Sequence, residues 1–191
     1  MPLTGFSFSR LNSTTNILPF ECGDYDLNSF LNNKAIPYKK ELLATTYLLE
    51  SEDRTIAYLS IYNDALAVQE KDFASKGAFN RLLKEMLSHP KRHLRQFPAI
   101  KIGRLAVCES TKKDRKGIGK ALVNFVIDLA LEQNISCACQ LITVDAYSQS
   151  LDFYKKLGFK FLTDSDEDDD TRQMYLDLRP LMNTAYDIMY S

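Results

Sequence analysis

The 191-residue sequence has few of the features that define several large classes of protein. It contains only four cysteines, with no Cys-x-x-Cys pair and no zinc-finger spacing, so buried free thiols are favoured over a metal site or a disulfide. No signal peptide can be recognised, and no apolar run approaches the ~18 residues of a membrane span, so a cytoplasmic protein without membrane contact is expected. The cysteines are Cys22, Cys108, Cys137 and Cys139.

Histidine is almost absent as well, and its arrangement argues against a metal centre. The two histidines, His89 and His93, stand four residues apart, a spacing that places side chains on one face of a helix. Pro90 lies between them and is poorly tolerated inside a helix, which spoils that pairing. Solvated histidines are therefore expected, and no metal is expected as a cofactor.

A large excess of charge of one sign is also missing. The chain carries 24 basic and 25 acidic residues, with a net charge of -1 and an isoelectric point of about 6.1. Because non-specific affinity for nucleic acid comes largely from basic residues that release counterions, a dominant electrostatic attraction to nucleic acid is not expected. The charges are nevertheless segregated, with basic residues gathered in 84–95 and acidic ones in 164–170, so a neutral total can hide a charged functional face.

Against this background, the segment from Ile102 to Val126 carries the clearest functional pattern. It predicts a strand ending at Cys108, a polar turn with Gly117 and Gly119 among basic residues, and a helix. The start of a helix directs free backbone N–H groups and the positive end of the helix dipole toward one point, which attracts phosphate. Glycine lets the phosphate oxygens approach the backbone. The apolar face of the expected helix consists of Ile118, Leu122, Val123, Val126, Ile127, Ala130 and Leu131.

Two common nucleotide-binding motifs do not fit the same turn. A Walker loop requires a glycine where Asp114 stands and a serine or threonine where Ala121 stands. The dinucleotide-binding fingerprint requires a third glycine at the position of Leu122. From this segment alone, a glycine-rich turn that simply begins a helix is the alternative.

A second motif downstream strengthens the functional interpretation. An apolar strand at 138–144 is followed by a short helix at 148–157, then by Gly158 and a strand that opens at Phe159. The strings RKGIGKAL (115–122) and SLDFYKKLGFKFL (150–162), the second with a Phe-Tyr-x-x-x-Gly-Phe pattern, resemble the GNAT superfamily of N-acetyltransferases. The order and separation of the two motifs match that family, and the resemblance covers most of the chain.

The resemblance implies a fold, a co-substrate and a set of binding residues. The fold is α/β of the α+β kind, with a mixed, mostly antiparallel central sheet of six to seven strands flanked by helices. The co-substrate is acetyl-CoA. Its pyrophosphate is held by the glycine turn, and its thioester and pantetheine arm meet the backbone of a splayed strand whose side chains are expected in the core. The residues expected to bind it are Leu105, Ala106, Val107, Arg115, Lys116, Gly117, Ile118, Gly119 and Lys120.

Two details qualify this resemblance. The family usually has Gln or Arg three positions before the first glycine, where this chain has Asp114; the adjacent Arg115 and Lys116 compensate electrostatically, so weaker or rearranged binding of acetyl-CoA is expected. The N-terminal string FECG (20–23), with Leu27, Phe30, Leu31 and RLAV (104–107), resembles the branch that includes bacterial toxins acetylating aminoacyl-tRNA.

Direct acetyl transfer requires a neutral amine, a polarised carbonyl and a stabilised leaving thiolate, but no covalent enzyme intermediate. By its place in the family motif, Tyr154 is the expected general acid, because a phenol of pKa ~10 is neutral at pH 7 and able to donate a proton; the alternative is that it only packs a helix on the sheet. Glu109 and Asp145 are candidates for a base that acts through water, although Asp145 could equally cap the next helix. An α-amino group of pKa ~8 needs no protein base.

The rest of the chain reads as one acetyltransferase domain over residues 1–191, because no repeat or linker interrupts it. A helix begun by an Asp cap is expected at 26–34, interrupted by Pro37. Residues 66–98, with an apolar helical stripe from Phe79 to Leu87, form either a substrate-side insertion or a cover for the sheet edge. Further strands are expected at 3–11, 45–49, 55–62 and 174–178, the second and third forming a hairpin and the last pairing antiparallel with 159–162.

Two further segments near the end of the sequence, one acidic and one apolar, remain to be placed. The acidic run at 164–170 is too charged for a core and is expected to be a solvated loop. The apolar tail at 181–190 packs either on the domain itself or on a second copy, which leaves a homodimer open.

The sequence therefore predicts an acetyl-CoA-dependent N-acetyltransferase that moves the acetyl group directly to a primary amine. The acceptor is open between the α-amine of aminoacyl-tRNA, a protein N-terminus or lysine, and a small amine. The toxin resemblance favours tRNA as the nucleic-acid substrate, whereas the near-neutral charge and the acidic run disfavour it. A non-catalytic acyl-CoA-binding module is the alternative, which Asp114 supports and Tyr154 opposes.

Overall fold

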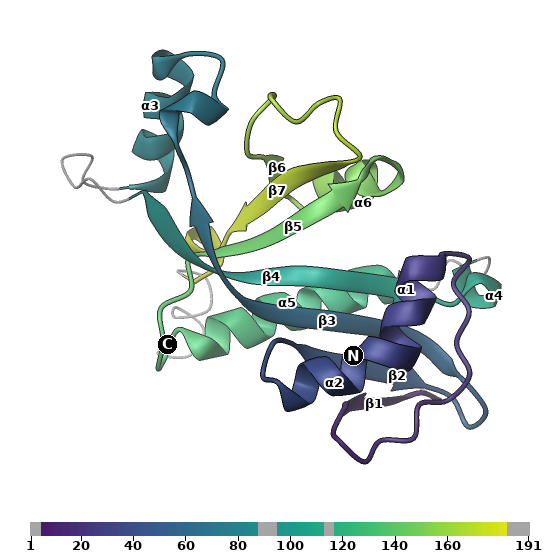
Figure 1. The fold of residues 1–191 in the computed structure, drawn as a ribbon. Helices are drawn as coiled ribbons and strands as arrows, with labels where there is room; N and C mark the ends of the chain where they lie inside the picture. The colour runs from purple at the N-terminus through teal and green to yellow at the C-terminus, as the bar shows by residue number, and fades with distance from the viewer. Residues whose placement is uncertain (1–4, 88–94, 113–116, 183–191) are drawn as a thin grey trace. The chain divides into compact units, whose positions relative to one another are not determined.

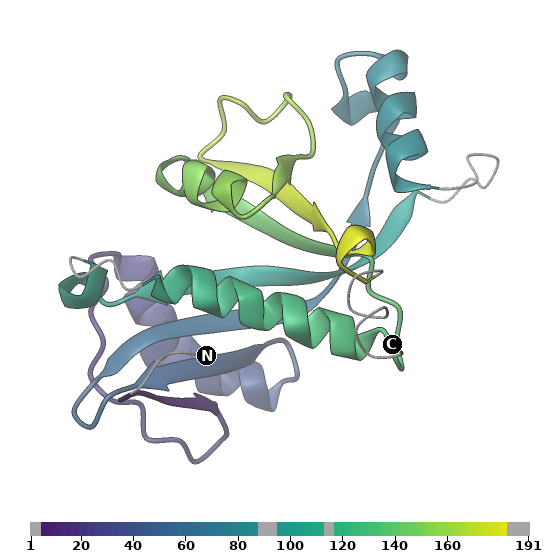
Figure 2. The same ribbon diagram turned by 180° about the vertical axis from the view of Figure 1, so that it is seen from behind.

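The computed structural model describes residues 5–87, 95–112 and 117–182, and its central element is a seven-stranded sheet (Figures 1 and 2). The strand order is β1-β2-β3-β4-β5-β7-β6. β1 with β2, β2 with β3, β5 with β7 and β6 with β7 are antiparallel pairs. This confirms the predicted fold class. The strands are β1 (Ser7–Arg10), β2 (Thr45–Glu50), β3 (Thr55–Ala67), β4 (Gln96–Val107), β5 (Leu141–Tyr147), β6 (Lys160–Phe161) and β7 (Thr171–Asp177).

The chain divides into two compact units. The first consists of residues 1–63 and 101–129, and the second of residues 64–100 and 130–191. The long strands β3 and β4 contribute residues to both units. A single acetyltransferase domain over the whole chain stays a prediction, and each unit is described by itself.

In the first unit, helices cover both faces of the sheet. Figure 1 shows α1 (Tyr25–Ser29) and α2 (Ala35–Lys40) on one face, and Figure 2 shows α5 (Ile118–Gln133) on the other. Phe125 of α5 packs edge-on against Phe8 and Tyr47. The opposite face holds a buried cluster that consists of Leu11, Phe20, Cys22, Phe30, Leu31, Ala35, Leu48, Tyr58, Ala106 and Cys108. We call it the first core.

The predicted helix at 26–34 is real, but the prediction that Pro37 interrupts it is wrong. Asp24 caps α1 by accepting a hydrogen bond from the Leu27 N–H at 3.0 Å. The chain then forms a π-helical turn, η1 (Phe30–Lys34), and continues as α2 to Lys40. Pro37 falls in the first turn after η1, where a residue without an N–H is tolerated.

In the second unit, the predicted apolar stripe forms α3 (Lys76–Met86), which follows the short turn η2 (Glu70–Asp72). Ser75 caps α3 by accepting from the Ala78 N–H at 3.1 Å. Phe79, Leu82 and Met86 are buried. They join a second core made of Leu66, Val68, Phe79, Leu82, Met86, Phe97, Ala99, Leu141, Leu162 and Tyr175. His89, His93 and most of the basic segment after α3 lie outside the described residues.

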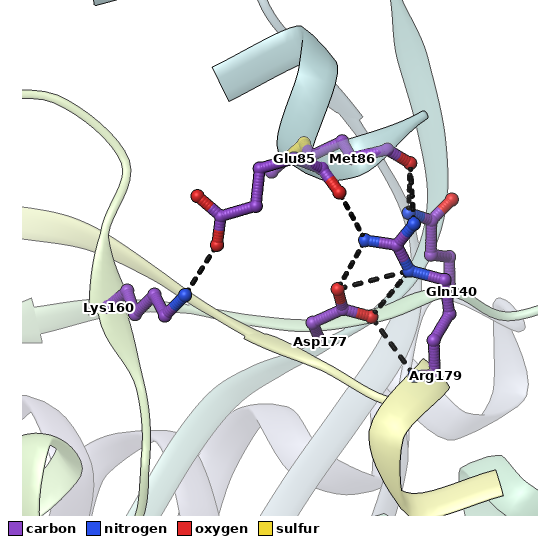
Figure 3. A network of polar contacts seen from close by, with 6 residues as sticks. All are labelled: Glu85, Met86, Gln140, Lys160, Asp177 and Arg179. Atoms are coloured by element: carbon purple, nitrogen blue, oxygen red, sulfur yellow. Dashed lines mark hydrogen bonds and ion pairs between the residues drawn. The ribbon is translucent and has the colours of Figure 1, made fainter. Parts of the chain in front are cut away.

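A network of polar contacts ties the end of α3 to β7 (Figure 3). The Arg179 guanidinium pairs with Asp177 and donates to the Glu85 and Met86 carbonyls at 2.7 and 3.1 Å. The Gln140 side-chain amide also donates to the Met86 carbonyl at 3.0 Å, and Lys160 pairs with Glu85. These bonds satisfy carbonyls that a helix C-terminus leaves without partners, so α3 is fixed to the sheet of its unit.

The strand expected at 138–144 begins three residues later, at Leu141. The reason is that the side chain of Asn134 forms hydrogen bonds with the backbone of Cys139, which precedes the strand. The Asn134 amide oxygen accepts from the Cys139 N–H at 2.9 Å, and its amide nitrogen donates to the Cys139 carbonyl at 2.8 Å. β5 accordingly runs to Tyr147, with Asp145 inside the strand opposite Gln173. The expectation that Asp145 caps the next helix is therefore wrong.

The cysteines are free, as expected, but not all are buried. Cys22, Cys108 and Cys139 are buried, whereas Cys137 is exposed. The described residues contain no group of three or more potential metal ligands and no helix long and apolar enough to cross a membrane.

The acidic run forms a loop between β6 and β7, with one exception to its expected solvation. The side chain of Asp166 is only 14% exposed and accepts from Arg172 Nε and from the Gln173 N–H. Arg172 in turn lies over the Phe161 ring, 3.7 Å from its centroid. One aspartate thus fixes the base of the loop, while Asp164 and 167–170 are exposed.

Candidate functional site

The predicted cofactor-binding residues at the end of β4 alternate between the two faces of the strand and differ in burial. Ala106 is buried in the first core, whereas Leu105 and Val107 are half-buried, so the expectation that all three side chains are core holds only for Ala106. The strand stays paired to β3 at this end, since the Cys108 N–H donates to the Ile56 carbonyl at 2.7 Å. The contact of their backbone with acetyl-CoA stays a prediction.

The glycine turn begins α5 as the sequence predicts. Gly117 has φ +67°, a conformation that favours glycine, and its carbonyl accepts from the Ala121 N–H at 3.0 Å. The N–H groups of Ile118, Gly119 and Lys120 belong to the first helical turn, which has no intrahelical acceptors. Buried Ile118 fixes this turn to the core, while Lys120 is exposed. Asp114, Arg115 and Lys116 lie outside the described residues.

These features fit the pyrophosphate of a coenzyme A group. A Cβ placed on Gly117 would meet no heavy atom of the described residues within 4 Å, which leaves space beside the turn among them. The first-turn N–H groups of a 16-residue helix and the cation of Lys120 supply hydrogen-bond donors and positive potential. Gly117, Ile118, Gly119 and Lys120 are therefore the described residues that would hold the diphosphate.

Tyr154 lies on α6 (Leu151–Lys156), after the short turn η3 (Ser148–Ser150). Its side chain is buried and packs edge-on against Phe153 and Phe159, with ring centroids 5.0 and 5.2 Å away. The Tyr154 carbonyl accepts from the Phe159 N–H at 3.1 Å across the turn at Gly158, which has φ +91°. The family motif therefore builds a rigid aromatic support for this one ring.

The hydroxyl of Tyr154 differs from the rest of the side chain. Burial raises its pKa above the ordinary tyrosine value, and the phenol is neutral at pH 7 with or without this shift. It makes no hydrogen bond to a described residue, yet no fully buried side-chain oxygen or nitrogen in the described ranges lacks a partner. The hydroxyl thus has no described partner that competes for its proton, which suits a proton donor.

Glu109 begins the short helix α4 (Glu109–Lys112) and is exposed. Its N–H donates to the Glu21 carbonyl at 3.0 Å, and its carboxylate lies 3.6 Å from where a Cβ of Gly23 would stand. The Glu21 carboxylate itself accepts from the Gly23 N–H and then from Asn28, which lowers its pKa. Glu109 is thus held beside the 20–23 turn, and its role as a base stays a prediction.

The residues of the N-terminal strings that resemble the toxin branch meet in the first core. They pack around Tyr58, a residue that no sequence motif singled out. Tyr58 is fully buried, stacks on Phe30 and packs edge-on against Phe20. Its hydroxyl donates to the Leu27 carbonyl at 2.8 Å. Only the continuous, largely apolar run at the start of β3 could have indicated its burial.

Comparison with known families assigns the chain to a class. The acetyltransferase (GNAT) family profile matches residues 23–159, which is more than half of the sequence. The chain therefore belongs to the GNAT family of acetyltransferases, and the prediction of an N-acetyltransferase that uses acetyl-CoA is confirmed. No curated protein matches the sequence.

Several solved structures share this fold over nearly the whole chain. A tyrosine-to-phenylalanine mutant of KacT has a TM-score of 0.73 and 19% identity, over 94% of this chain and 99% of its own. AtaTR bound with acetyl-CoA has a TM-score of 0.71 and 17% identity, over 98% and 99%. AtaT complexed with acetyl-methionyl-tRNAfMet has a TM-score of 0.69 and 16% identity, over 97% and 99%. At these identities the likeness shows the fold.

Proposed function

We propose that this protein transfers the acetyl group of acetyl-CoA to the α-amino group of an aminoacyl-tRNA in the cytoplasm. The observation that carries the proposal is the completeness of the match to the AtaT structure with acetyl-methionyl-tRNAfMet, which covers 97% of this chain and 99% of that one. The match leaves little of either chain outside it. Other GNAT acceptors, such as protein amines and polyamines, are the competing choices.

The exposed face of α3 supports an RNA acceptor. Lys76, Arg81 and Lys84 are exposed, while the opposite side of the helix packs Phe79 and Leu82 into the second core. The acidic neighbour Glu85 is engaged by Lys160. A basic helix face fixed to a rigid sheet can bind phosphates even though the whole chain has a net charge of -1.

The chemistry follows from the residues described above. Bound acetyl-CoA supplies an acetyl group activated as a thioester. Gly117 to Lys120 bind and orient its diphosphate through backbone N–H groups and one cation. Tyr154 holds a proton at its hydroxyl, as a phenol does at pH 7, and can donate it to the leaving sulfur. An α-amino group of pKa ~8 is partly neutral at pH 7, so Glu109 assists proton removal without being indispensable.

An acceptor competition tests the proposal. Purified protein and labelled acetyl-CoA would be incubated with charged tRNA, a peptide with a free N-terminus and spermidine, and acetylated products would be separated. We expect product on charged tRNA and none on deacylated tRNA, which lacks the amine. Product on spermidine alone would contradict the proposal and would favour a small cationic amine as the acceptor.

A further inference from the structure

Arg104 lies on β4, directly before the predicted cofactor-binding residues, and the function proposed above does not use it. Its guanidinium carbon is 3.9 Å from the centroid of the Phe30 ring. Phe30 is 1% exposed and stacks on the buried ring of Tyr58, with centroids 6.2 Å apart and ring planes 20° apart. The charged group is therefore held over a rigid aromatic pair.

The guanidinium has no anionic partner in the described part of the chain. Arg54, Arg172 and Arg179 each pair with a carboxylate. Arg104 is half-buried, yet no described residue forms a salt bridge or hydrogen bond with its side chain. A guanidinium has five N–H donors, and stacking on a ring satisfies none of them. The donors are thus available to a ligand.

The position of Arg104 on the strand separates it from the glycine turn. Alternation along β4 puts Arg104 on the same face as Ala106 and Cys108, which pack in the first core. α5, whose first turn would hold the diphosphate, packs through Phe125 on the opposite face of the same sheet. A phosphate bound by Arg104 would therefore lie on the face of the sheet opposite to the diphosphate at the glycine turn.

We propose that Arg104 binds a phosphate of the RNA acceptor and that the stack of Phe30 and Tyr58 holds it ready for this contact. An arginine fork matches the oxygens of a phosphate in a bidentate way, and a guanidinium already immobilised on a ring loses less rotational freedom when it binds. The inference rests on the proposed function for the identity of the acceptor. The same chemistry would also accept a phosphate of coenzyme A, so the experiment distinguishes the two sources.

The test measures RNA binding separately from catalysis. Full-length protein would be titrated into a fluorescently labelled, deacylated tRNA minihelix over a series of salt concentrations, and acetyl-CoA affinity would be measured by calorimetry. Arg104→Met keeps much of the side-chain volume. Arg54→Met is the matched control, since Arg54 belongs to the same unit but pairs with Asp53.

For Arg104→Met we expect minihelix binding to weaken at least about fivefold, with a slope of log affinity against log salt that is smaller by about 0.7 to 0.9, as for the loss of one phosphate contact. Acetyl-CoA affinity should not change, and Arg54→Met should behave as wild type. Arg104→Lys keeps the charge without the fork, so it should retain the salt slope but bind more weakly than wild type.

Three results would overturn the assignment: unchanged minihelix affinity and salt slope in a folded Arg104→Met protein, weakened acetyl-CoA binding with intact minihelix binding, or no minihelix binding by the wild type at low salt. Failure of the proposed function gives a different pattern. Wild-type protein would then bind the minihelix through Arg104 but would not acetylate charged tRNA.

Discussion

Tyr58 in the first unit and Tyr154 in the second are both buried, and burial raises the pKa of each. The Tyr58 hydroxyl donates to the Leu27 carbonyl, whereas the Tyr154 hydroxyl has no partner among the described residues. The same residue type in a similarly apolar setting therefore has a structural use in one region and is free for chemistry in the other. Burial alone does not distinguish the two tyrosines, but the presence or absence of a hydrogen-bond partner for the hydroxyl does.

Two arginines repeat the contrast. Arg179 directs its donors to Asp177, Glu85 and Met86 and so completes the end of α3. Arg104 is held by stacking on Phe30 and keeps its donors free of described partners. Groups whose hydrogen bonds are complete should affect stability when changed, and groups held in place without partners should affect binding or turnover.

The largest effect is expected when the glycine turn is changed. Gly119→Asp adds a negative charge to the first turn of α5, where the diphosphate would bind, so acetyl-CoA affinity should fall on the order of 100-fold, or about 3 kcal/mol. Isothermal calorimetry measures this, with Gly119→Ala as the uncharged control. Equal losses in both variants would mean that shape, and not charge, limits the site.

Tyr58→Phe should lower stability and leave catalysis intact. The variant loses one buried hydrogen bond, but the Leu27 carbonyl still accepts from the Phe30 N–H, so the free energy of unfolding should fall by about 1 kcal/mol. Urea denaturation measures the loss, and kcat per folded molecule should stay near wild type. A loss of turnover without a loss of stability would break the contrast between the two tyrosines.

Arg179→Met should weaken the attachment of α3. The side chain is 39% exposed, so solvent screens its ion pair, and a loss of about 1 kcal/mol in unfolding free energy is expected mainly from the bonds to the Glu85 and Met86 carbonyls. Hydrogen exchange at the end of α3 should accelerate as well. Arg81→Met, on the exposed face of the same helix, serves as the control. Slow exchange at α3 in the Arg179 variant would show that the second core alone holds the helix.

The smallest of the predicted effects is the loss of stability when the carboxylate of Asp177 is protonated at acid pH. Burial raises the pKa of Asp177, but the hydrogen bonds from Arg179 outweigh it and hold the pKa below its usual value. The stability that this carboxylate contributes is therefore fully present above its unfolded pKa of ~4 and is lost as the pH falls through the folded pKa. The difference in melting temperature between wild type and Asp177→Asn should be largest near neutral pH and should shrink below pH ~4. A constant difference would argue against this ionisation.

The fold class was predicted from the resemblance to a known family, whereas local sequence patterns predicted the position of the two motifs, because periodicity and glycine turns act over a few residues. The apolar spacing of α5 and the turn at Gly158 are examples. The start of β5 could not be predicted, since the Asn134 side chain competes for the backbone of Cys139 and no periodicity reports such a bond. The continuation of a helix past Pro37 depends similarly on the π-turn before it.

The parts of the site that the sequence missed depend on contacts between distant residues. Arg104 and Phe30 meet only because β4 and η1 pack in the same core. Arg179 caps a helix that ends 93 residues earlier in the chain. Pairings of this kind follow from the tertiary fold and leave no local signature. Tyr154 was predictable because its motif is contiguous, although its catalytic role stays a prediction.

The most direct test of the account is the single-turnover rate of acetyl transfer to charged tRNA by Tyr154→Phe, with Tyr58→Phe measured beside it at saturating acetyl-CoA. The account predicts that Tyr154→Phe transfers acetyl at least about tenfold more slowly, with unchanged acetyl-CoA affinity and melting temperature, because only the proton donor is lost. Tyr58→Phe should transfer at the wild-type rate. A Tyr154→Phe rate within about twofold of wild type would contradict the role of this hydroxyl as the general acid.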